Sequence, residues 1–310
     1  MKLGGIHHVT AIASDPAANA AFYTEVLGMR LVKKTVNFDD PSTYHLYYGD
    51  DTGTPGTILT FFPWPDARRG TPGVGQVTAF AFQVPIGSLS FWRKHLESVG
   101  LAIVEEGTRF GEKFIATQDP DEFALEFIET ADAASVAPTR AMIPPEHALR
   151  GFHGATLSLE AQEQSGAILT KLMGAVLETN EGNRFRYILG EGPGRARIDL
   201  LCLPAGRSGT GGTGIVHHIA WRVADDTAQL AARTELVSAG LNVSPVIDRN
   251  YFHSIYYREP GGVLFEIATD PPGFAVDESP DTLGKKLMLP EWLEPHRSVL
   301  ETTLPPLKSP

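Results

Sequence analysis

Apolar and polar positions along this chain repeat one plan four times. Each repeat opens with an apolar stretch rich in the β-branched and aromatic residues that are typical of a strand. A stretch with apolar residues at helical spacing follows, and Gly28, Gly100 and Gly240 predict where three of these helices stop. Further strand-like stretches close each repeat. The pattern therefore predicts four βαβββ modules.

The modules and their connections divide the chain into five parts. The four predicted modules and a final extended tail, packed on the body, span residues 1–70, 71–133, 150–205, 214–270 and 271–310. The segments 130–149 and 206–214 are rich in Pro, Gly, Ala or Ser, and we interpret both as linkers. One module would leave a sheet face uncovered, whereas two modules together would close a cup. The predicted fold class is α+β, with two open barrel-like cups.

The composition is that of an ordinary globular protein, with 42% hydrophobic and 20% charged residues among 310. A net charge of -11 argues against a nucleic-acid partner, because such binding depends on Lys and Arg at the phosphates. No apolar run could span a bilayer and no secretory signal is recognisable, so we expect no membrane partner. The single cysteine, Cys202, is interpreted as a buried structural thiol and fits a cytoplasmic location. Whether the protein forms a homo-oligomer stays open.

The repeat allows equivalent positions to be compared without any other sequence. When the four first strands are aligned on their apolar pattern, His8 lies level with one residue of each other module: Gln76, Gly154 and His218. Each of the two histidines follows another histidine, and neighbouring strand residues point to opposite faces. We therefore expect the preceding residues, His7 and His217, to face elsewhere.

The last strands offer a carboxylate in three of the four modules. Aligned on the turn before the strand, Glu266 lies level with Glu126 in module two and Asp199 in module three. Module one offers Thr60 or Phe61 at this position and therefore no carboxylate.

The chemistry of these positions depends on which modules share a cup. Pairing modules one and four unites a set of two histidines and one carboxylate: His8, His218 and Glu266. Pairing modules two and three leaves a poor metal site without histidine: Gln76, Glu126 and Asp199. If modules three and four shared a cup, His153 would be the fallback ligand. Two imidazoles and one carboxylate leave neighbouring metal positions open and suit non-haem Fe(II), so we expect modules one and four to share the metal cup.

Several stretches of the sequence resemble one known family. They include GIHHVTAI, YHLYYGDDTGTPGT, GIVHHIAW, DRNYFHSIYYREPGGVLFE and LPEWLEP. Over nearly its full length the chain resembles the vicinal-oxygen-chelate superfamily, which includes glyoxalase I, extradiol dioxygenases and fosfomycin-resistance enzymes. More narrowly, it is similar to the hydroquinone-type ring-cleaving dioxygenases.

The resemblance implies a role for individual residues. His8, His218 and Glu266 would bind Fe(II), or Mn(II) with the same ligands, and O₂ would be the co-substrate. Arg249 and Tyr256 would be catalytic residues on the substrate side of the metal. The residues that orient the ligands would be His7, Thr10 and His217.

The implied activity is oxidative cleavage of a small aromatic substrate, a hydroquinone or a catechol, that binds the metal through a ring oxygen. Two alternatives stay open. A glyoxalase-like isomerase with Zn or Ni would need a second carboxylate, which module one lacks. A non-catalytic protein of the same fold would bind a small molecule without turnover, but such proteins usually lack the metal ligands.

Overall fold

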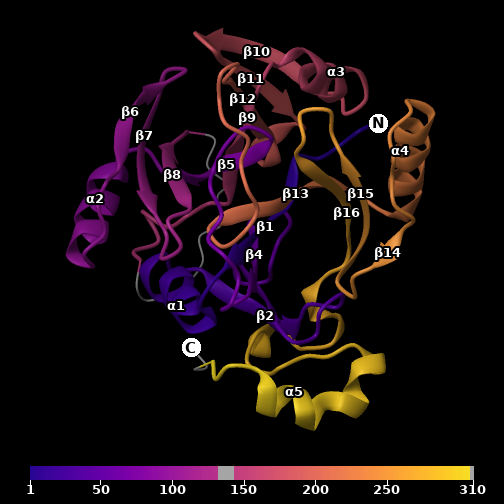
Figure 1. Cartoon of the computed structure of the whole chain (residues 1–310). Coiled ribbons are helices and arrows are strands. Elements are labelled where there is room, and N and C mark those ends of the chain that lie inside the picture. Colours follow the sequence, from indigo (N-terminus) through magenta and orange to yellow (C-terminus); the bar gives the residue numbers. More distant parts are fainter. Residues whose placement is uncertain (132–142, 308–310) are drawn as a thin grey trace.

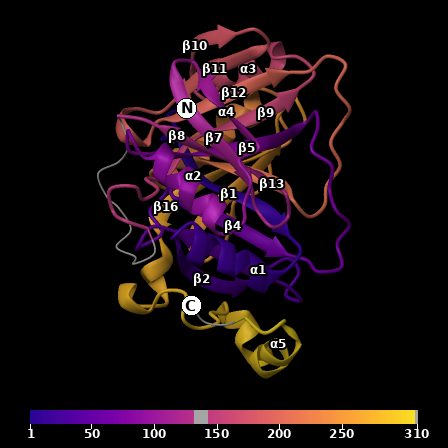
Figure 2. The same ribbon diagram turned by 90° about the vertical axis from the view of Figure 1, so that its left-hand side faces the viewer.

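The computed structural model describes residues 1–131 and 143–307 and contains two curled eight-stranded sheets (Figure 1). In a view turned by 90°, the C-terminal segment again lies at one end of the molecule, away from the second sheet (Figure 2). The α+β class and the two cups predicted from the repeat are confirmed.

The first sheet joins the strands of modules one and four. The strand order is β14-β15-β16-β13-β1-β4-β3-β2. At its centre β1 pairs antiparallel with β13, and each is flanked by the parallel closing strand of its own module, β4 or β16. The strands, in sheet order, are Ile247–Asp248, Phe252–Arg258, Leu264–Pro272, Ile215–Val223, Ile6–Ala13, Ile58–Pro63, Tyr44–Gly49 and Arg30–Val36. The predicted pairing of modules one and four is confirmed.

The second sheet repeats this plan with modules two and three. The strand order is β10-β11-β12-β9-β5-β8-β7-β6, with β5 and β9 antiparallel at the centre. The strands, in sheet order, are Val176–Glu181, Arg184–Leu189, Ala196–Cys202, Phe152–Leu159, Gln76–Val84, Ala124–Glu129, Glu112–Gln118 and Glu105–Arg109.

Four helices cover the outer sides of the sheets (Figure 1). They are α1 (Pro16–Ala21), α2 (Leu89–Ser98), α3 (Glu163–Lys171) and α4 (Asp226–Ser238), and a π-helical turn, Phe22–Val26, extends α1. The three glycines predicted to stop helices have φ angles of 71°, 81° and 86°. This left-handed conformation is open to glycine at little cost, so the predicted helix ends are explained.

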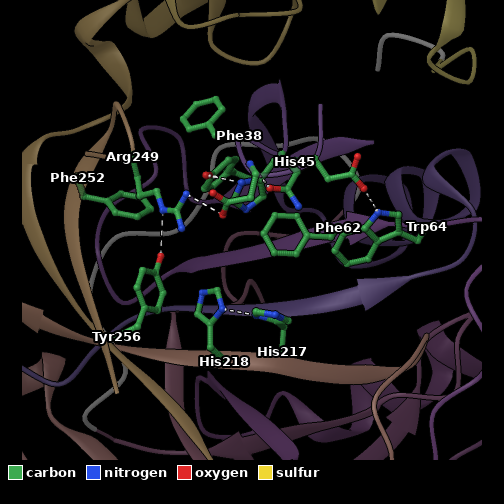
Figure 3. Close-up of a pocket in the computed structure, with 13 residues that line it drawn as sticks. Phe38, His45, Phe62, Trp64, His217, His218, Arg249, Phe252 and Tyr256 are labelled. Carbon is green, nitrogen blue, oxygen red and sulfur yellow. Dashed lines mark hydrogen bonds and ion pairs between the residues drawn. The ribbon is translucent and has the colours of Figure 1, made fainter. Parts of the chain in front are cut away.

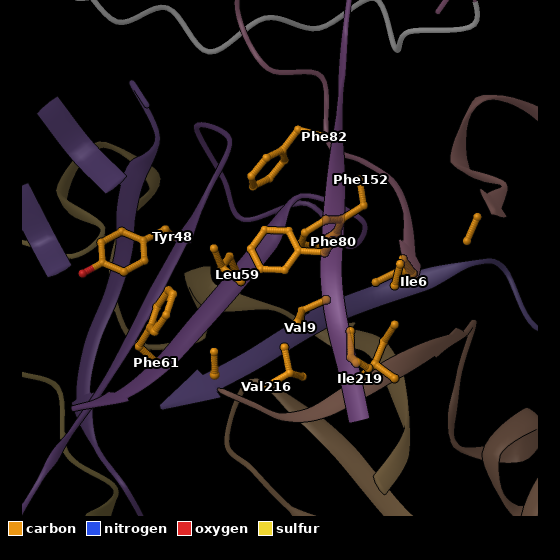
Figure 4. Packing of buried hydrophobic residues seen from close by; sticks show 14 of the residues in the cluster. Ile6, Val9, Tyr48, Leu59, Phe61, Phe80, Phe82, Phe152, Val216 and Ile219 are labelled. Carbon is orange, nitrogen blue, oxygen red and sulfur yellow. The ribbon is translucent and has the colours of Figure 1, made fainter. Parts of the chain in front are cut away.

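The main hydrophobic core runs between the two sheets, where Figure 4 shows part of it, and continues under the helices. Val9 of β1 and Ile219 of β13 are fully buried there and lie near Phe80 and Phe152 of the second sheet. Because neighbouring strand residues alternate between faces, the histidines that precede Val9 and Ile219 face away from this core and into the first cup.

The C-terminal segment was predicted to be extended, but its described part, residues 271–307, contains four short helical stretches. They are Phe274–Val276, Pro280–Thr282, Glu291–His296 and α5, Arg297–Thr303. Leu293, Leu300 and Leu304 recur at helical spacing and are buried, a signal that the many prolines obscured. The buried ammonium of Lys33 on β2 anchors the segment by ion pairs to Asp277 and Glu278, at 2.5 and 2.6 Å.

The described parts of the two predicted linkers lie outside the named strands. Residues 206–214 form isolated bridges with residues 69–74. Of the linker 130–149, residues 132–142 lie outside the described residues. In the part of the chain that the structure describes, no helix is both long and apolar enough to cross a membrane.

Candidate metal centre

The three side chains predicted to bind a metal meet inside the first cup. His8 lies on β1, His218 on β13 and Glu266 on β16, which are neighbouring strands. The Nε2 atoms of the two histidines are 3.3 Å apart. Glu266 Oε2 lies 2.9 Å from His218 Nε2 and 3.3 Å from His8 Nε2. Three ligand atoms from distant parts of the sequence therefore surround one point.

The carboxylate of this site has an oxygen without a hydrogen-bond donor. Glu266 is fully buried, and its Oε1 accepts a hydrogen bond from the Ser254 hydroxyl at 2.5 Å. Among the described residues, none forms a hydrogen bond with the second oxygen, Oε2. A buried carboxylate oxygen is costly without a partner, and a cation would pair with it. Two imidazole nitrogens and one carboxylate oxygen are a donor set that fits a divalent transition metal.

The ionisation of the ligands also suits a metal. Burial alone would raise the pKa of Glu266, but the two imidazoles beside it outweigh burial and hold that pKa well below its usual range. Burial lowers the pKa of His218, so this imidazole is neutral near pH 7. A charged Glu266 carboxylate and a neutral His218 imidazole are the forms in which these two groups bind a metal.

A β-bulge lies at each histidine doublet. In the pairing of β1 with β13, the register skips His7 on one strand and His217 on the other. As expected, neither residue is among the three side chains that could hold a metal. They do not lie on the opposite face of the strand, however, because a bulge interrupts the alternation and turns each extra side chain toward its neighbour. His7 Nδ1 lies 2.9 Å from His8 Nδ1, and His217 Nδ1 lies 2.8 Å from His218 Nδ1.

These contacts can fix the tautomer of each ligand. Burial lowers the pKa of His7 well below its usual range and that of His217 to about 3, so both rings are neutral acceptors. When the proton of His8 or His218 is on Nδ1 and is donated to that neighbour, Nε2 carries the lone pair that a metal needs. The geometry supports the orienting role that the resemblance implies for His7 and His217.

Thr60 occupies in module one the position that Glu266 occupies in module four. In the parallel strand pairing, Thr60 lies opposite Thr10, two positions after His8. Glu266 lies in the same way opposite Ala220, two positions after His218. The Thr60 hydroxyl donates to Thr10 Oγ1 at 2.9 Å, and His45 Nε2 lies 2.9 Å from Thr60 Oγ1. The symmetric fourth position therefore holds a hydroxyl instead of a carboxylate.

The second cup has neither histidine ligand. Bulges at Thr78 and His153 in the β5–β9 pairing match those of the first cup. The strand register therefore places Ala79 at the position equivalent to His8, where Gln76 was predicted. Gly154 is at the position equivalent to His218, as predicted. The apolar pattern gave an offset three residues too early because the same Val-Thr-Ala run follows both His8 and Gln76.

The carboxylates of the second cup are paired with arginines. Arg109 Nη1 donates to both oxygens of Glu126 at 2.9 Å. Arg186 donates to the two oxygens of Asp199, from Nε at 2.7 Å and from Nη2 at 3.0 Å. His153, the fallback ligand, lies against another carboxylate of this cup. Guanidinium groups thus supply the positive charge that a metal would supply in the first cup.

A cavity of about 260 Å³ lies next to His218 (Figure 3). Aromatic rings make up much of its wall: Phe38, Tyr47, Phe62, Trp64, Phe252 and Tyr256. The rings of Tyr256 and His218 are 5.7 Å apart between centroids, and Arg249 Nε donates to the Tyr256 hydroxyl at 3.2 Å. The structure therefore brings Arg249 and Tyr256 together beside the triad.

Two residues of the site were missed by the sequence analysis. Ser254, which donates to Glu266, lies two positions before Tyr256 on β15, and this spacing puts both on one face of the strand. His45 lines the cavity, and its Nδ1 lies 2.8 Å from the Tyr47 hydroxyl. The alternation of His45 and Tyr47 on β3 is a signal that could have found the pair.

Comparisons with known proteins agree with this architecture. The sequence matches the Glyoxalase/Bleomycin resistance protein/Dioxygenase superfamily over residues 5–127 and 152–267. It is 48% identical over 307 residues to "Putative ring-cleaving dioxygenase MhqO" of Bacillus subtilis (strain 168), covering 99% of this chain and 97% of that protein. It is 36% identical over 310 residues to "Chlorohydroquinone/hydroquinone 1,2-dioxygenase" of Sphingobium indicum, covering 98% of this chain and 96% of that protein.

A solved structure extends the agreement to three dimensions. A crystal structure of a protein from Bacillus subtilis subsp. subtilis str. 168 has a TM-score of 0.96 with this chain at 48% identity, and covers 100% of this chain and 99% of its own. The chain belongs to the Glyoxalase/Bleomycin resistance protein/Dioxygenase superfamily. Within this superfamily, the relatives support a dioxygenase.

Proposed function

We propose that this protein is a ring-cleaving dioxygenase that acts on hydroquinone- or catechol-type aromatics and holds Fe(II) with His8, His218 and Glu266. The observation that carries the proposal is the convergence of three buried ligand atoms, all within 4.8 Å of one another, beside an aromatic-walled cavity. The names of the relatives, which include a hydroquinone dioxygenase, support the same reaction. Mn(II) accepts these ligands as well.

Fe(II) held by His8, His218 and Glu266 would supply the redox chemistry that activates O₂ toward the substrate ring. The protein contributes binding and exclusion of water. The aromatic wall of the cavity can hold one ring by stacking and edge contacts, with Phe62 and Phe252 on different sides of His218 (Figure 3). The volume of about 260 Å³ suits a single substituted ring.

Tyr256 is a hydrogen-bond donor in this proposal. Burial and the nearby Glu266 carboxylate raise the pKa of Tyr256, so its phenol keeps its proton near neutral pH. Arg249 Nε donates to this hydroxyl oxygen, which leaves the phenol proton available to a substrate oxygen. Arg249 keeps its charge and stabilises negative charge that develops on the substrate.

The test combines metal loading with a comparison between the two cups. Anaerobically loaded protein should bind one Fe(II) and consume O₂ with a panel of hydroquinones and catechols. Glu266→Gln should lose iron and O₂ uptake together. Glu126→Gln, at the equivalent position of the second cup, is the matched control and should keep both. Iron retained at full occupancy in Glu266→Gln would contradict the ligand assignment.

The same experiment separates the alternatives. Zinc or nickel in the protein, without O₂ uptake, would favour a glyoxalase-like isomerase, although Thr60 stands where that reaction needs a second carboxylate. Tight binding of aromatics by metal-free protein, without turnover, would favour a non-catalytic binding protein.

A further inference from the structure

The entrance to the cavity carries three charged side chains. Asp39 and Asp40 come from the loop between β2 and β3, and Arg249 comes from the segment between β14 and β15. Among the described residues that line the cavity, Arg249 is the only lysine or arginine. A substrate with a carboxylate on its ring would need this guanidinium as its partner, because arginine binds carboxylates through paired donors.

Arg249 already has partners on two sides. Its Nη1 lies 3.0 Å from Asp39 Oδ2, and its Nε donates to Tyr256 at 3.2 Å. The Arg249 side chain is 18% exposed, whereas that of Asp39 is 73% exposed. Asp39 therefore reaches from the solvent side to a guanidinium that belongs to the cavity wall.

Asp40 is a second anion of the same loop, with different partners. Its carboxylate accepts hydrogen bonds from the Ser42 hydroxyl at 2.6 Å and from Trp64 Nε1 at 2.9 Å. These hydrogen bonds lower the pKa of Asp40, which is therefore charged near neutral pH. Asp40 adds negative charge to the entrance without pairing with Arg249.

We propose that Asp39 determines substrate charge: by pairing with Arg249 at the cavity entrance, it makes the site select uncharged ring substituents and reject ring carboxylates. The inference deepens the proposed function and rests on it. A carboxylate on the ring would have to displace Asp39 from Arg249 and then lie next to two aspartates. Methyl or halogen substituents meet only the aromatic wall.

The test measures discrimination between two matched ligands, methylhydroquinone and 2,5-dihydroxybenzoate. Anaerobic calorimetry on the Fe(II)-loaded protein gives both dissociation constants, and O₂ uptake gives both KM values. We expect the wild type to bind the carboxylate much more weakly. The quantity compared is the dissociation constant of the carboxylate divided by that of methylhydroquinone. Asp39→Asn should reduce this ratio by at least about tenfold, the scale of one hydrogen bond to a charged group. Asp40→Asn, the control, removes the same charge but should change the ratio less than about threefold.

The results distinguish a failure of the proposed role of Asp39 from a failure of the proposed dioxygenase function. Equal binding of the two ligands by the wild type, or equal effects of Asp39→Asn and Asp40→Asn, would overturn the role of Asp39 while leaving the dioxygenase proposal in place. If no hydroquinone or catechol binds or is oxidised, the proposed function fails and the inference falls with it. Asp39 is exposed, so thermal unfolding should show Asp39→Asn folded as the wild type is.

Discussion

Ser254 should control metal affinity without touching the metal. Its hydroxyl is the hydrogen-bond donor that the structure gives to Oε1 of Glu266, at 2.5 Å, and both residues are fully buried. Ser254→Ala removes this donor and leaves Oε1 free to rotate away from the direction that points Oε2 at the two histidines. The perturbation therefore acts on the orientation and the solvation of a metal ligand.

The expected size follows from the kind of hydrogen bond that is lost. A hydrogen bond to a charged group contributes about 1.5–3 kcal/mol, and loss of a residue that orients a ligand typically weakens metal binding by about 10–100-fold. Ser254→Ala should therefore raise the Fe(II) dissociation constant by about 10–100-fold, with kcat at saturating iron affected less.

Ser165 provides the matched control. It is also buried, and its hydroxyl donates at 2.6 Å to the buried carboxylate of Glu259, which follows β15 and is not one of the three residues that could hold the metal. Chelator competition under anaerobic conditions measures the dissociation constant, and urea unfolding of metal-free protein measures stability. Both serine variants should lose stability, but only Ser254→Ala should lose iron affinity. Unchanged iron affinity in Ser254→Ala would show that this hydrogen bond does not orient Glu266 for the metal.

Two further predictions concern a buried carboxyl group and the proposed donor. Burial raises the pKa of Asp119 to about 6, so the folded state binds its proton more tightly than the unfolded state. The protonated carboxyl of Asp119 therefore contributes to the free energy of unfolding below about pH 4. This contribution is lost as pH rises through about 6, and its upper limit is about 3 kcal/mol. The urea-unfolding free energy of Asp119→Asn relative to wild type should therefore increase between pH 4 and pH 7; a constant difference would contradict this. Tyr256→Phe should keep its iron but lower kcat at least about tenfold, measured by O₂ uptake at saturating iron, and an unchanged kcat would remove Tyr256 from the reaction.

The repeat made much of the fold predictable. Helical spacing, glycine stops and strand composition recur four times, so each module supported the interpretation of the others. The triad followed from the same comparison, because two histidines and a carboxylate converge only when modules one and four share a cup.

The remaining features depend on details that periodicity does not encode. The bulges at His7 and His217 are set by strand pairing, and they reverse the alternation on which the sequence analysis relied. A different effect misplaced Gln76: the Val-Thr-Ala run that follows it also follows His8, whereas the strand register has Ala79 at the position of His8. Pairing across strands also explains why Ser254 was missed, because its partner Glu266 is on the next strand.

Anomalous diffraction at the iron edge, from crystals of Fe(II)-loaded protein, tests directly whether His8, His218 and Glu266 hold the metal. We expect one strong peak within bonding distance of His8 Nε2, His218 Nε2 and Glu266 Oε2, and none at Glu126 and Asp199 in the second cup. A peak elsewhere, or no peak at the triad in fully loaded protein, would contradict this assignment of the ligands.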